Sequence, residues 1–574
     1  MKKIIFLILG IFSFCSTNSQ INFKNFASEK GLNLNTGSTE YGSGVSFCDF
    51  DNDGWDDISV ATDEGQTIRF FKNNGGDFSE VFFNIVFENS VSKQINWVDI
   101  DNDGDKDLFV TSNSSGNKLY RNDGEFNLFD ITSDSGLYTN NLETSGTSWG
   151  DYNNDGFLDV FITNRGEINP QQNFLFKNNG NYTFSDVTSE AGIDNESHLS
   201  FCSAFFDFNN DGLQDIYVSN DKFQNQNFLY KNNGDGTFSD VSDSSGTNIT
   251  IDAMTTTIGD FNNDGWFDIY ISNTPSGNVL FLNNQDETFT NVAETTGTEF
   301  NSFGWGAVFL DAENDMDLDL YVSGSFDGSN QNLISAAFYN NDSGVFTQSS
   351  TNGFDGDTNE SYSNAIGDIN NDGFPEILVN NGGDENISLW ENDANQTNNW
   401  LKIKLIGSVS NKDAIGSRIE LSVNNIKQYR YTHSGEGFLA QNSSSEFFGL
   451  GANSQVDYLK INWLSGLEEY FYDISSNQIL EIIEGTGTLS LLENKIIEQK
   501  TSAFPNPTNS KIKIESNKLL LNLQVIDSFG NLVSEIEDIN RFNFELDLTF
   551  LNSGVYLLKY STNIQENIVK VIKL

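Results

Sequence analysis

The chain has 574 residues, of which 37% are hydrophobic and 20% charged, and this is the composition of a folded protein longer than one ordinary domain. Its 82 Asp and Glu residues outnumber its 30 Lys and Arg residues, giving a formal net charge of -52. This charge argues against binding to nucleic acid or to an anionic membrane surface. We therefore expect several domains and no nucleic-acid partner.

Residues 1–19 have the pattern of a secretory signal peptide. Two lysines precede an apolar run from Ile4 to Phe14, which is too short to span a bilayer, and small polar residues follow it. A lipid-modified Cys15 is the alternative, but such signals have a small residue where this chain has the bulky Phe14. We expect cleavage after residue 19 and export of the mature chain.

An acidic nine-residue segment, here called the acidic loop, recurs seven times. The first copy reads D-F-D-N-D-G-W-D-D, and the copies begin at Asp49, Asp99, Asp151, Asp207, Asp260, Asp311 and Asp368. Their spacing of about 50 to 57 residues is typical of repeat architectures. Oxygen-bearing side chains always occupy the first, third, fifth and ninth places, whereas the seventh place varies among Trp, Asp, Phe and Leu. The seventh place can therefore contribute only its backbone.

The acidic loops have the ligands that a calcium site needs. Ca²⁺ binds oxygen atoms, and its loops combine alternating carboxylates with a sharp turn at the sixth place and a backbone carbonyl at the seventh. Asn fills the fourth place of every copy, which suits a turn with left-handed dihedrals. The predicted ligands, with the seventh-place residues acting through their carbonyl groups, are Asp49, Asp51, Asp53, Trp55, Asp57, Asp99, Asp101, Asp103, Asp105, Asp107, Asp151, Asn153, Asp155, Phe157, Asp159, Asp207, Asn209, Asp211, Leu213, Asp215, Asp260, Asn262, Asp264, Trp266, Asp268, Asp311, Glu313, Asp315, Asp319, Asp368, Asn370, Asp372, Phe374 and Glu376. Up to seven Ca²⁺ ions are expected.

Each repeat contains four predicted strands, the content of one β-propeller blade. In the first repeat they cover Val45–Phe50, Ile58–Ala61, Thr67–Lys72 and Phe78–Phe83, with a hairpin signal between the last two. The seventh repeat lacks its fourth strand, whereas Phe23–Leu32 resembles the fourth strands of other repeats. We predict that this N-terminal segment supplies the outer strand of the last blade and closes a seven-bladed ring.

These repeats resemble the FG-GAP/VCBS type of integrin alpha chains and cartilage acidic protein, in which D-x-[DN]-x-D-G-x-x-D loops bind Ca²⁺. The resemblance covers about Ile21–Asn395 and implies a propeller domain at 20–398. Two copies depart from the motif. Met316 replaces the turn glycine of the sixth loop, so the site at Asp311–Asp319 is expected to be strained and is the least supported of the seven. Glu376 replaces the ninth-place Asp of the seventh loop and is long enough to reach the ion.

Residues 399–485 follow a different pattern. They contain W-L-K-I-K-L-I-G from Trp400, A-I-G-S-R-I from Ala414, F-F-G-L-G from Phe447 and I-N-W-L-S-G from Ile461. This segment resembles the ASPIC/UnbV domain, which follows such repeats in that family. We expect a small β domain with a structural role, followed by a linker at 486–502.

Residues 503–574 alternate apolar and polar positions as an antiparallel sandwich would. They resemble the type A sorting domain of the type IX secretion system of Bacteroidota. The positions that carry the resemblance are Pro505, Asn506, Pro507, Gly530, Gly554, Tyr556, Lys570 and Lys573. The resemblance implies the type IX secretion machinery as a partner and export through the outer membrane, with the cargo then released or attached to the cell surface.

The loops at the propeller end away from the acidic loops are rich in amide side chains. They lie at Asn164–Asn173, Asn220–Asn227 and Ser325–Asn332. Amide groups can hydrogen-bond sugar hydroxyls. Asn-rich loops are also common as solvated turns, so both interpretations stay open.

Few residues point to catalysis. His198 and His433 lie in different domains and outside any metal-binding pattern. Cys48 and Cys202 are expected to be buried small hydrophobic residues rather than a disulfide. The acidic loops account for the paired acids, although a lyase or hydrolase could hide its acid and base among 82 carboxylates.

The predicted fold is all-β: a seven-bladed β-propeller, a small β domain and a C-terminal Ig-like β-sandwich. We predict a secreted or cell-surface, calcium-binding monomer that acts as a binding or adhesion module for an extracellular glycan or protein. An extracellular carbohydrate-active enzyme on the same scaffold is the alternative, and a purely structural surface protein is the third possibility. Because Ca²⁺ loops and hairpins share one end of each blade, we expect the ligand at the other end.

Overall fold

The structure is a computed structural model that describes residues 21–487 and 502–574, apart from internal segments at 86, 88–89, 125–126, 139–141, 326–333, 349–351, 355–356, 384, 393–396, 505, 528–530, 537–538, 540 and 563–565. The predicted signal at 1–19, most of the predicted linker, nearly all of the third amide-rich loop, Pro505 and Gly530 lie outside the described residues. The chain divides after Gly487 into two compact units.

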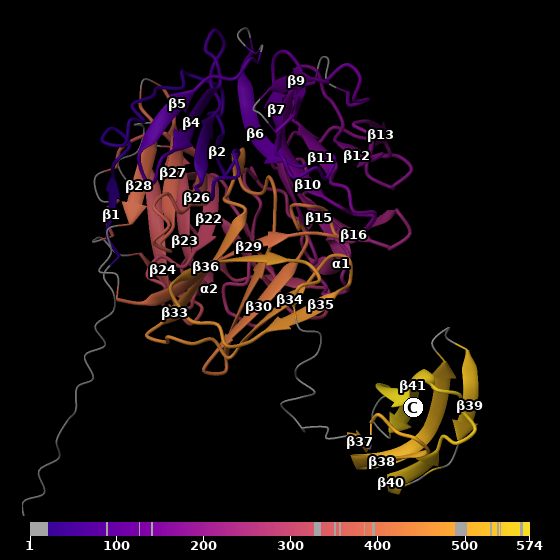
Figure 1. Ribbon diagram of the computed structural model, residues 1–574. Coiled ribbons are helices and arrows are strands. Elements are labelled where there is room, and N and C mark those ends of the chain that lie inside the picture. The colour runs from indigo at the N-terminus through magenta and orange to yellow at the C-terminus, as the bar shows by residue number, and fades with distance from the viewer. Residues whose placement is uncertain are drawn as a thin grey trace, which may run out of the picture. The chain divides into compact units, whose positions relative to one another are not determined.

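Seven sheets make up the repeat region of the described chain, and six of them contain four consecutive antiparallel repeat strands (Figure 1). In order, the first six are β2 (Val45–Cys48), β3 (Asp57–Val60), β4 (Arg69–Asn73) and β5 (Phe78–Val81); β6 (Ser92–Val98), β7 (Asp107–Ser112), β8 (Lys118–Asn122) and β9 (Leu128–Asp130); β10 (Thr144–Gly150), β11 (Asp159–Asn164), β12 (Phe174–Asn178) and β13 (Phe184–Asp186); β14 (Ser200–Phe206), β15 (Asp215–Asn220), β16 (Phe228–Asn232) and β17 (Phe238–Asp240); β18 (Thr257–Gly259), β19 (Asp268–Ile271), β20 (Val279–Asn283) and β21 (Phe289–Asn291); and β22 (Phe303–Leu310), β23 (Asp319–Ser325), β24 (Ala336–Asp342) and β25 (Val345–Gln348). Each acidic loop joins the first strand of a sheet to the second.

The last sheet combines the two ends of the repeat region. It contains β26 (Ser361–Gly367), β27 (Glu376–Asn381) and β28 (Ser388–Asn392), and its outer strand is β1 (Phe23–Asn25). β1 pairs antiparallel with β28, with Phe23 opposite Asn392. The predicted closure by the N-terminal segment is confirmed, and it covers the edge that β28 would otherwise expose.

Apolar side chains between neighbouring sheets hold the blades together. The first strand of each sheet is almost fully buried, including its Ser, Thr, Asn and Gln residues. Between the first two sheets, Phe50, Phe70 and Phe83 surround Trp97 with ring centroids 5.2–5.8 Å apart. Cys48 lies in the same cluster as a free, buried thiol, as predicted, and Cys202 is also free and buried.

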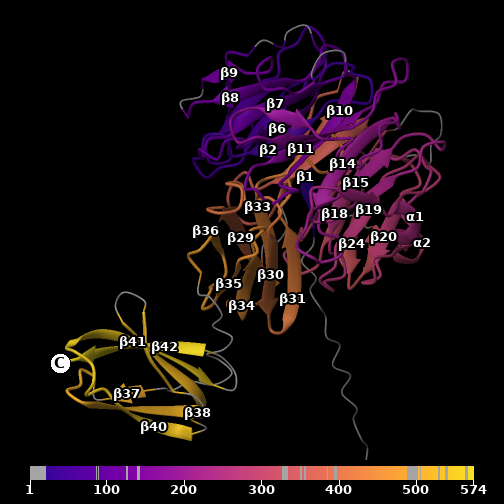
Figure 2. The same cartoon turned by 90° about the vertical axis from the view of Figure 1, so that its right-hand side faces the viewer.

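A second domain, here called the cap (residues 399–487), is built from two sheets around one core. One sheet contains β33 (Ser445–Gly451), β29 (Asn399–Ile406) and β36 (Gln478–Ile483), and the other contains β31 (Ile426–Tyr431), β30 (Arg418–Val423), β34 (Tyr458–Asn462) and β35 (Glu468–Phe471). Ile403, Leu421 and Phe448 lie at the centre of this core. Figure 2 shows the cap against one end of the propeller.

The second unit is a six-stranded antiparallel assembly in which both ends of the long strand β38 (Lys511–Asp527) pair with neighbouring strands. Its other strands are β37 (Ser502–Phe504), β39 (Leu532–Ile536), β40 (Arg541–Asp547), β41 (Gly554–Thr562) and β42 (Glu566–Lys573). Ile512, Val525 and Leu558 form part of its core.

The helices of the described residues are the single turns α1 (Ser242–Ser245) and α2 (Ala293–Thr296). Neither they nor any other described helix has the length and apolar character that crossing a membrane requires.

Candidate metal sites and the opposite face

The backbone of the acidic loops is folded around their carboxylates. In all seven loops the first-place Asp accepts the backbone N–H groups of the fifth and sixth residues at 2.8–3.2 Å. The fifth-place Asp accepts the N–H of the seventh residue at 2.9–3.3 Å. The chain is thus wrapped with its acidic side chains turned inward, as a cation loop requires.

The ninth-place acid is the first residue of the second strand in every sheet and is buried there. Burial raises the pKa of Asp57 and Asp107 to about 8, and it raises the pKa of Glu376 well above its ordinary value. The same cause raises the pKa of Asp159, Asp215, Asp268 and Asp319. Buried carboxylates of this kind need a compensating cation when ionised.

The residues present fit a bound cation. In the first loop one oxygen each of Asp49, Asp51 and Asp57 lie within 4.8 Å of one another, and the equivalent oxygens of the second loop do the same. Four of the predicted ligands each have a buried oxygen without a hydrogen-bond partner: Asp51, Asp101, Glu313 and Glu376. Carboxylate and amide oxygens are the donors that Ca²⁺ prefers. The loops therefore have the donor set for Ca²⁺, with the third-place oxygens uncommitted in three loops.

In some loops a lysine supplies positive charge beside the predicted ligands. The ammonium group of Lys72 contacts Asp51 and lies 2.9 Å from Asp53 in the first loop. Lys177 lies 3.1 Å from Asp155 in the third. These ammonium groups neutralise part of the charge that a metal ion would neutralise. The seven loops therefore differ in how much positive charge the protein itself provides.

The fourth-place Asn has a role that the sequence interpretation missed. Its φ angle is 55–62° in all seven loops, as predicted for a left-handed turn. In six loops its side-chain amide also donates to the carbonyl of the sixth residue in the next loop, at 2.7–3.1 Å. The bond from Asn371 to Gly54 joins the last loop to the first. The strict use of Asn was the available signal, because a left-handed turn alone would also accept Gly.

A second Asn at the end of each third strand was also missed. In six sheets its N–H donates to the ninth-place acid at 2.7–2.9 Å. In six sheets its side-chain amide donates to the second-place carbonyl of the preceding loop at 2.6–2.9 Å. These residues are Asn73, Asn122, Asn178, Asn232, Asn283, Asn341 and Asn392. They tie each predicted ligand set to the neighbouring blade.

The sixth loop keeps the same turn although Met316 replaces glycine. Met316 has a φ of 88°, which is strained for a side chain, and its N–H still donates to Asp311 at 2.9 Å. Its side chain packs against the core of the cap. The predicted strain is present, and the contact with the cap gives a physical reason for it.

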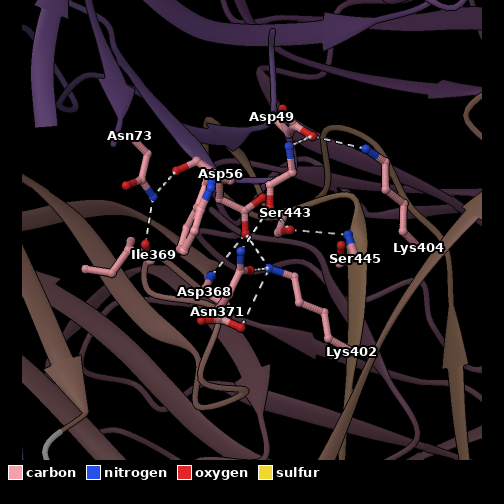
Figure 3. A network of polar contacts seen from close by, with 12 residues as sticks. Asp49, Asp56, Asn73, Asp368, Ile369, Asn371, Lys402, Lys404, Ser443 and Ser445 are labelled. Carbon is pink, nitrogen blue, oxygen red and sulfur yellow. Dashed lines mark hydrogen bonds and ion pairs between the residues drawn. The ribbon is translucent and has the colours of Figure 1, made fainter. Parts of the chain in front are cut away.

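The cap contacts the acidic loops on both sides of the seam between the first and last blades, as the network of Figure 3 shows. Lys402 and Lys404 lie on the same face of β29 because side chains alternate along a strand. Lys404 Nζ is 3.1 Å from Asp49, and Lys402 Nζ is 2.8 Å from Asn371 and 3.6 Å from Asp368. Both lysines therefore contact predicted loop residues.

Asp56, at the eighth place of the first loop, links three parts of this seam. It accepts the N–H of Asp368 at 3.0 Å and the hydroxyl of Ser443 at 2.8 Å, and it lies 3.5 Å from Lys402 Nζ. The sequence interpretation assigned no role to Asp56. The available signal in the sequence was that a second acid, Asp56, stands directly before the ninth-place Asp57 at the end of the first loop.

A segment of the cap, here called the channel loop (Ser434–Ser443), runs along the first strands at the centre of the ring. It contains β32 (Ala440–Gln441), which pairs parallel with β2. Its other contacts include Ser434 O with Trp149 N, Gly437 N with Thr256 O, and Ser443 N with Ile366 O, each at 2.9 Å. These partners belong to different blades. The channel loop therefore fills the middle of the propeller.

The tip of the channel loop reaches the end of the propeller opposite the acidic loops. Phe438 and Leu439 pack there with Phe201 and Trp305. A cavity of about 130 Å³ lies at this end, here called the channel mouth, lined by Glu40, Tyr41, Lys93, Asn113, Glu143, Ser145, Arg165, Glu167, Ile168, Phe201 and Leu439. Several of these residues lie at or near the start of a first strand, which is the end away from the acidic loops.

The channel mouth combines charged and apolar groups. The Arg165 guanidinium is 4.2 Å from the ring centroid of Tyr41 and 4.6 Å from that of Phe201, and it donates to Asp221 and Glu167. Lys93 is buried and donates to the carbonyls of Glu40 and Gly42, and burial lowers its pKa to about 7. The Asn113 carbonyl oxygen is buried without a partner.

Two of the predicted amide-rich loops flank the channel mouth. A second hollow of about 360 Å³ lies between them, lined by residues that include Pro170, Lys222, Gln224 and Asn225. The loops end in exposed apolar side chains, since Ile168 is 90% and Phe223 75% exposed. This end of the propeller therefore presents amide groups and apolar tips beside a polar cavity.

Comparisons with known proteins match three families. An FG-GAP-like repeat model matches residues 49–110, 99–162, 151–218, 207–271 and 260–322. An ASPIC and UnbV model matches 407–489, and a secretion system C-terminal sorting domain model matches 502–574. The chain carries FG-GAP repeats, an ASPIC/UnbV domain and a sorting domain. The cap is this ASPIC/UnbV domain. The sorting domain indicates export through the outer membrane to the cell surface or the extracellular space.

Parts of the chain are similar to animal proteins. Cartilage acidic protein 1 of Xenopus tropicalis is 23% identical over 75% of this chain and 71% of its own length. The Homo sapiens protein of the same name is 27% identical over 49% of this chain and 47% of its own length. Among solved structures, the extracellular domain of a hybrid two-component system from B. thetaiotaomicron has a TM-score of 0.39 at 14% identity, covering 96% of this chain and 67% of that one.

Proposed function

We propose that this secreted protein is a calcium-stabilised binding module that takes a glycan at the channel mouth. The observation that carries the proposal is the mixed chemistry of that cavity, where charged donors and acceptors meet apolar side chains at an end that the ASPIC/UnbV domain reaches only with the tip of the channel loop. Pockets with a few convergent polar groups on an apolar wall are typical ligand sites.

The chemistry of the channel mouth suits hydroxyl groups. A sugar hydroxyl both donates and accepts hydrogen bonds, and the cavity offers carboxylates of Glu143 and Glu167 together with the Asn113 oxygen as acceptors. The cations that line it are already engaged, Arg165 with two carboxylates and Lys93 with two carbonyls. A strongly anionic ligand is therefore disfavoured relative to a neutral one.

The flanking loops extend the same surface. Phe223 and Ile168 are exposed at the tips of neighbouring loops whose remaining side chains are largely amides. An exposed aromatic ring beside amide groups can contact the apolar face of a sugar while the amides bond its hydroxyls. Isolated solvated turns would not need these two apolar tips.

Calcium in the acidic loops is proposed as a brace rather than a catalyst. Each loop folds its backbone around its first- and fifth-place carboxylates, so that several protein oxygens surround the proposed ion, whereas a catalytic metal must keep an open position. The ASPIC/UnbV domain also lies against this face, through Lys402, Lys404 and the channel loop. The proposed ions therefore fix the loops on the covered end while the ligand binds at the other.

A glycan array and a polysaccharide-degradation panel test the proposal on the mature chain. Binding without turnover is expected, and Phe223→Ala with Ile168→Ala should weaken it by about tenfold. The matched control is Phe82→Ala, since Phe82 is 82% exposed but lies outside the amide-rich loops. Turnover would favour the enzyme alternative, and silence in both assays would favour a structural role.

A further inference from the structure

The sixth acidic loop, like the second, has carboxylates at five alternate places, whereas the other loops have at most four there. Its first, third, fifth, seventh and ninth places are Asp311, Glu313, Asp315, Asp317 and Asp319. The second loop also has a carboxylate at the seventh place, Asp105, and otherwise shares this density. Asp317 and Asp105 are therefore the same residue type at the same place, and a comparison between them shows how the surroundings of the seventh place affect metal binding.

Two carboxylates of the sixth loop have uncommitted buried oxygens. Glu313 is 5% exposed, and while its Oε1 accepts a bond from Asn340, its Oε2 is buried without a partner. Asp317 Oδ1 is likewise buried without a partner. Asp105 has no such orphaned atom among the described residues.

The protein supplies no ion-pair partner to the sixth loop. Among the described residues, none of its five carboxylates forms an ion pair with Lys or Arg. In the first loop, by contrast, Lys72 and Lys404 contact three of the predicted ligands. Buried carboxylates without a cationic partner need a bound cation whenever they are ionised.

We propose that the sixth loop is the tightest Ca²⁺ site of the chain and that Asp317 binds the ion through its carboxylate. This inference rests on the proposed binding of calcium to the acidic loops. Calcium affinity rises with the charge and rigidity of the ligand set. Rigidity comes from the cap, because Gly451 N–H donates to Asn314 O at 2.8 Å and the Met316 side chain packs into the cap core. Met316, whose replacement of glycine is expected from the sequence to weaken the site, thus holds the sixth loop against the cap.

Calcium titration of the full mature chain by calorimetry, after removal of metal, tests the inference with Asp317→Asn. The variant is expected to lose at least tenfold in affinity at the tightest class of sites. Asp105→Asn is the matched control and should leave that class unchanged. Equal losses in the two variants, or no loss in Asp317→Asn, would overturn the inference.

Thermal unfolding in chelator separates a ligand from a residue that merely supports the fold. Asp317→Asn removes one unpaired buried charge, so its melting temperature without calcium should equal or exceed that of the unmodified chain. A lower melting temperature in chelator would assign Asp317 a structural role instead. A chain that binds no calcium at all would refute the proposed metal sites, whereas tight binding that ignores Asp317 would refute only this inference.

Discussion

The two ends of the propeller are built in different ways. At the acidic-loop end the same residues recur in seven loops, and the ASPIC/UnbV domain covers them. At the channel mouth the segment before β2 and the second, third and fourth blades contribute different side chains, and the cap reaches it only with the tip of the channel loop. Repetition at one end thus provides a uniform support, whereas variation at the other provides a surface that can be specific for a ligand.

Of the changes predicted here, removal of calcium should lower the stability of the acidic-loop end the most. A ligand that binds only the folded state stabilises it, by about 2.7 kcal/mol for each site at a hundredfold excess over its Kd. Several occupied loops should therefore raise the melting temperature by on the order of 10 °C. Differential scanning calorimetry with calcium and with chelator measures the shift. An unchanged melting curve would contradict the assignment of the loops as calcium sites.

The pH dependence without metal provides the next test. The folded pKa of Asp57 and of Asp107 is about 8, above the ordinary value of 3.8, so the folded chain binds more protons than the unfolded chain between these values. Stability must then fall as the pH rises from about 4 to about 8. In chelator we expect a melting temperature several degrees lower at pH 8 than at pH 5.5. Calcium should reduce or reverse this slope, and a slope unaffected by calcium would separate these acids from the metal.

Much of the acidic-loop end could be predicted from the sequence because its signals are local. The loop spacing, the left-handed Asn and the displaced strand β1 all follow from short motifs and their repetition. The contacts of Lys402 with Asp56 and Asp368 could not be predicted in this way. Lys402 follows Asp56 by hundreds of residues and Asp368 by tens of residues, and no local motif connects them. The K-I-K alternation in β29 showed only that Lys402 and Lys404 share a face.

The channel loop was the feature least accessible from the sequence. Its G-E-G motif indicates turns, and nothing local shows that these turns lie inside a ring of strands. The structure shows why Gly435 is required, since its φ is 84° and a Cβ there would lie 2.4 Å from Thr147 O. A glycine motif in a domain that follows a propeller is therefore worth testing for insertion into the ring.

Gly435→Ala should displace the channel loop and destabilise the chain by about 3 kcal/mol or more, since it adds a backbone clash to an unfavourable φ. Gly466→Ala is the matched control, because Gly466 has a φ of 86° but no atom within 4 Å of the added carbon, so only about 1 kcal/mol is expected. Urea unfolding measures both. Equal losses would mean that the channel loop tolerates displacement and does not support the channel mouth.

Lys402→Met should have the smallest of these effects, about 2 kcal/mol, and should act at the seam between the first and last blades. The Lys402 side chain is 4% exposed, and its removal leaves the Asp56 and Asp368 carboxylates without their cation. Both acids keep backbone or hydroxyl donors, which limits the loss. Lys404→Met is the control on the same strand face, and because the Lys404 side chain is 25% exposed its loss should cost less than about 1 kcal/mol.

If the seam is held through Lys402, limited proteolysis of the Lys402→Met chain should cleave near the junction of β1 and β28 earlier than in the Lys404→Met chain. Identical cleavage in the two variants would show that the β1 strand closes the ring without help from the ASPIC/UnbV domain.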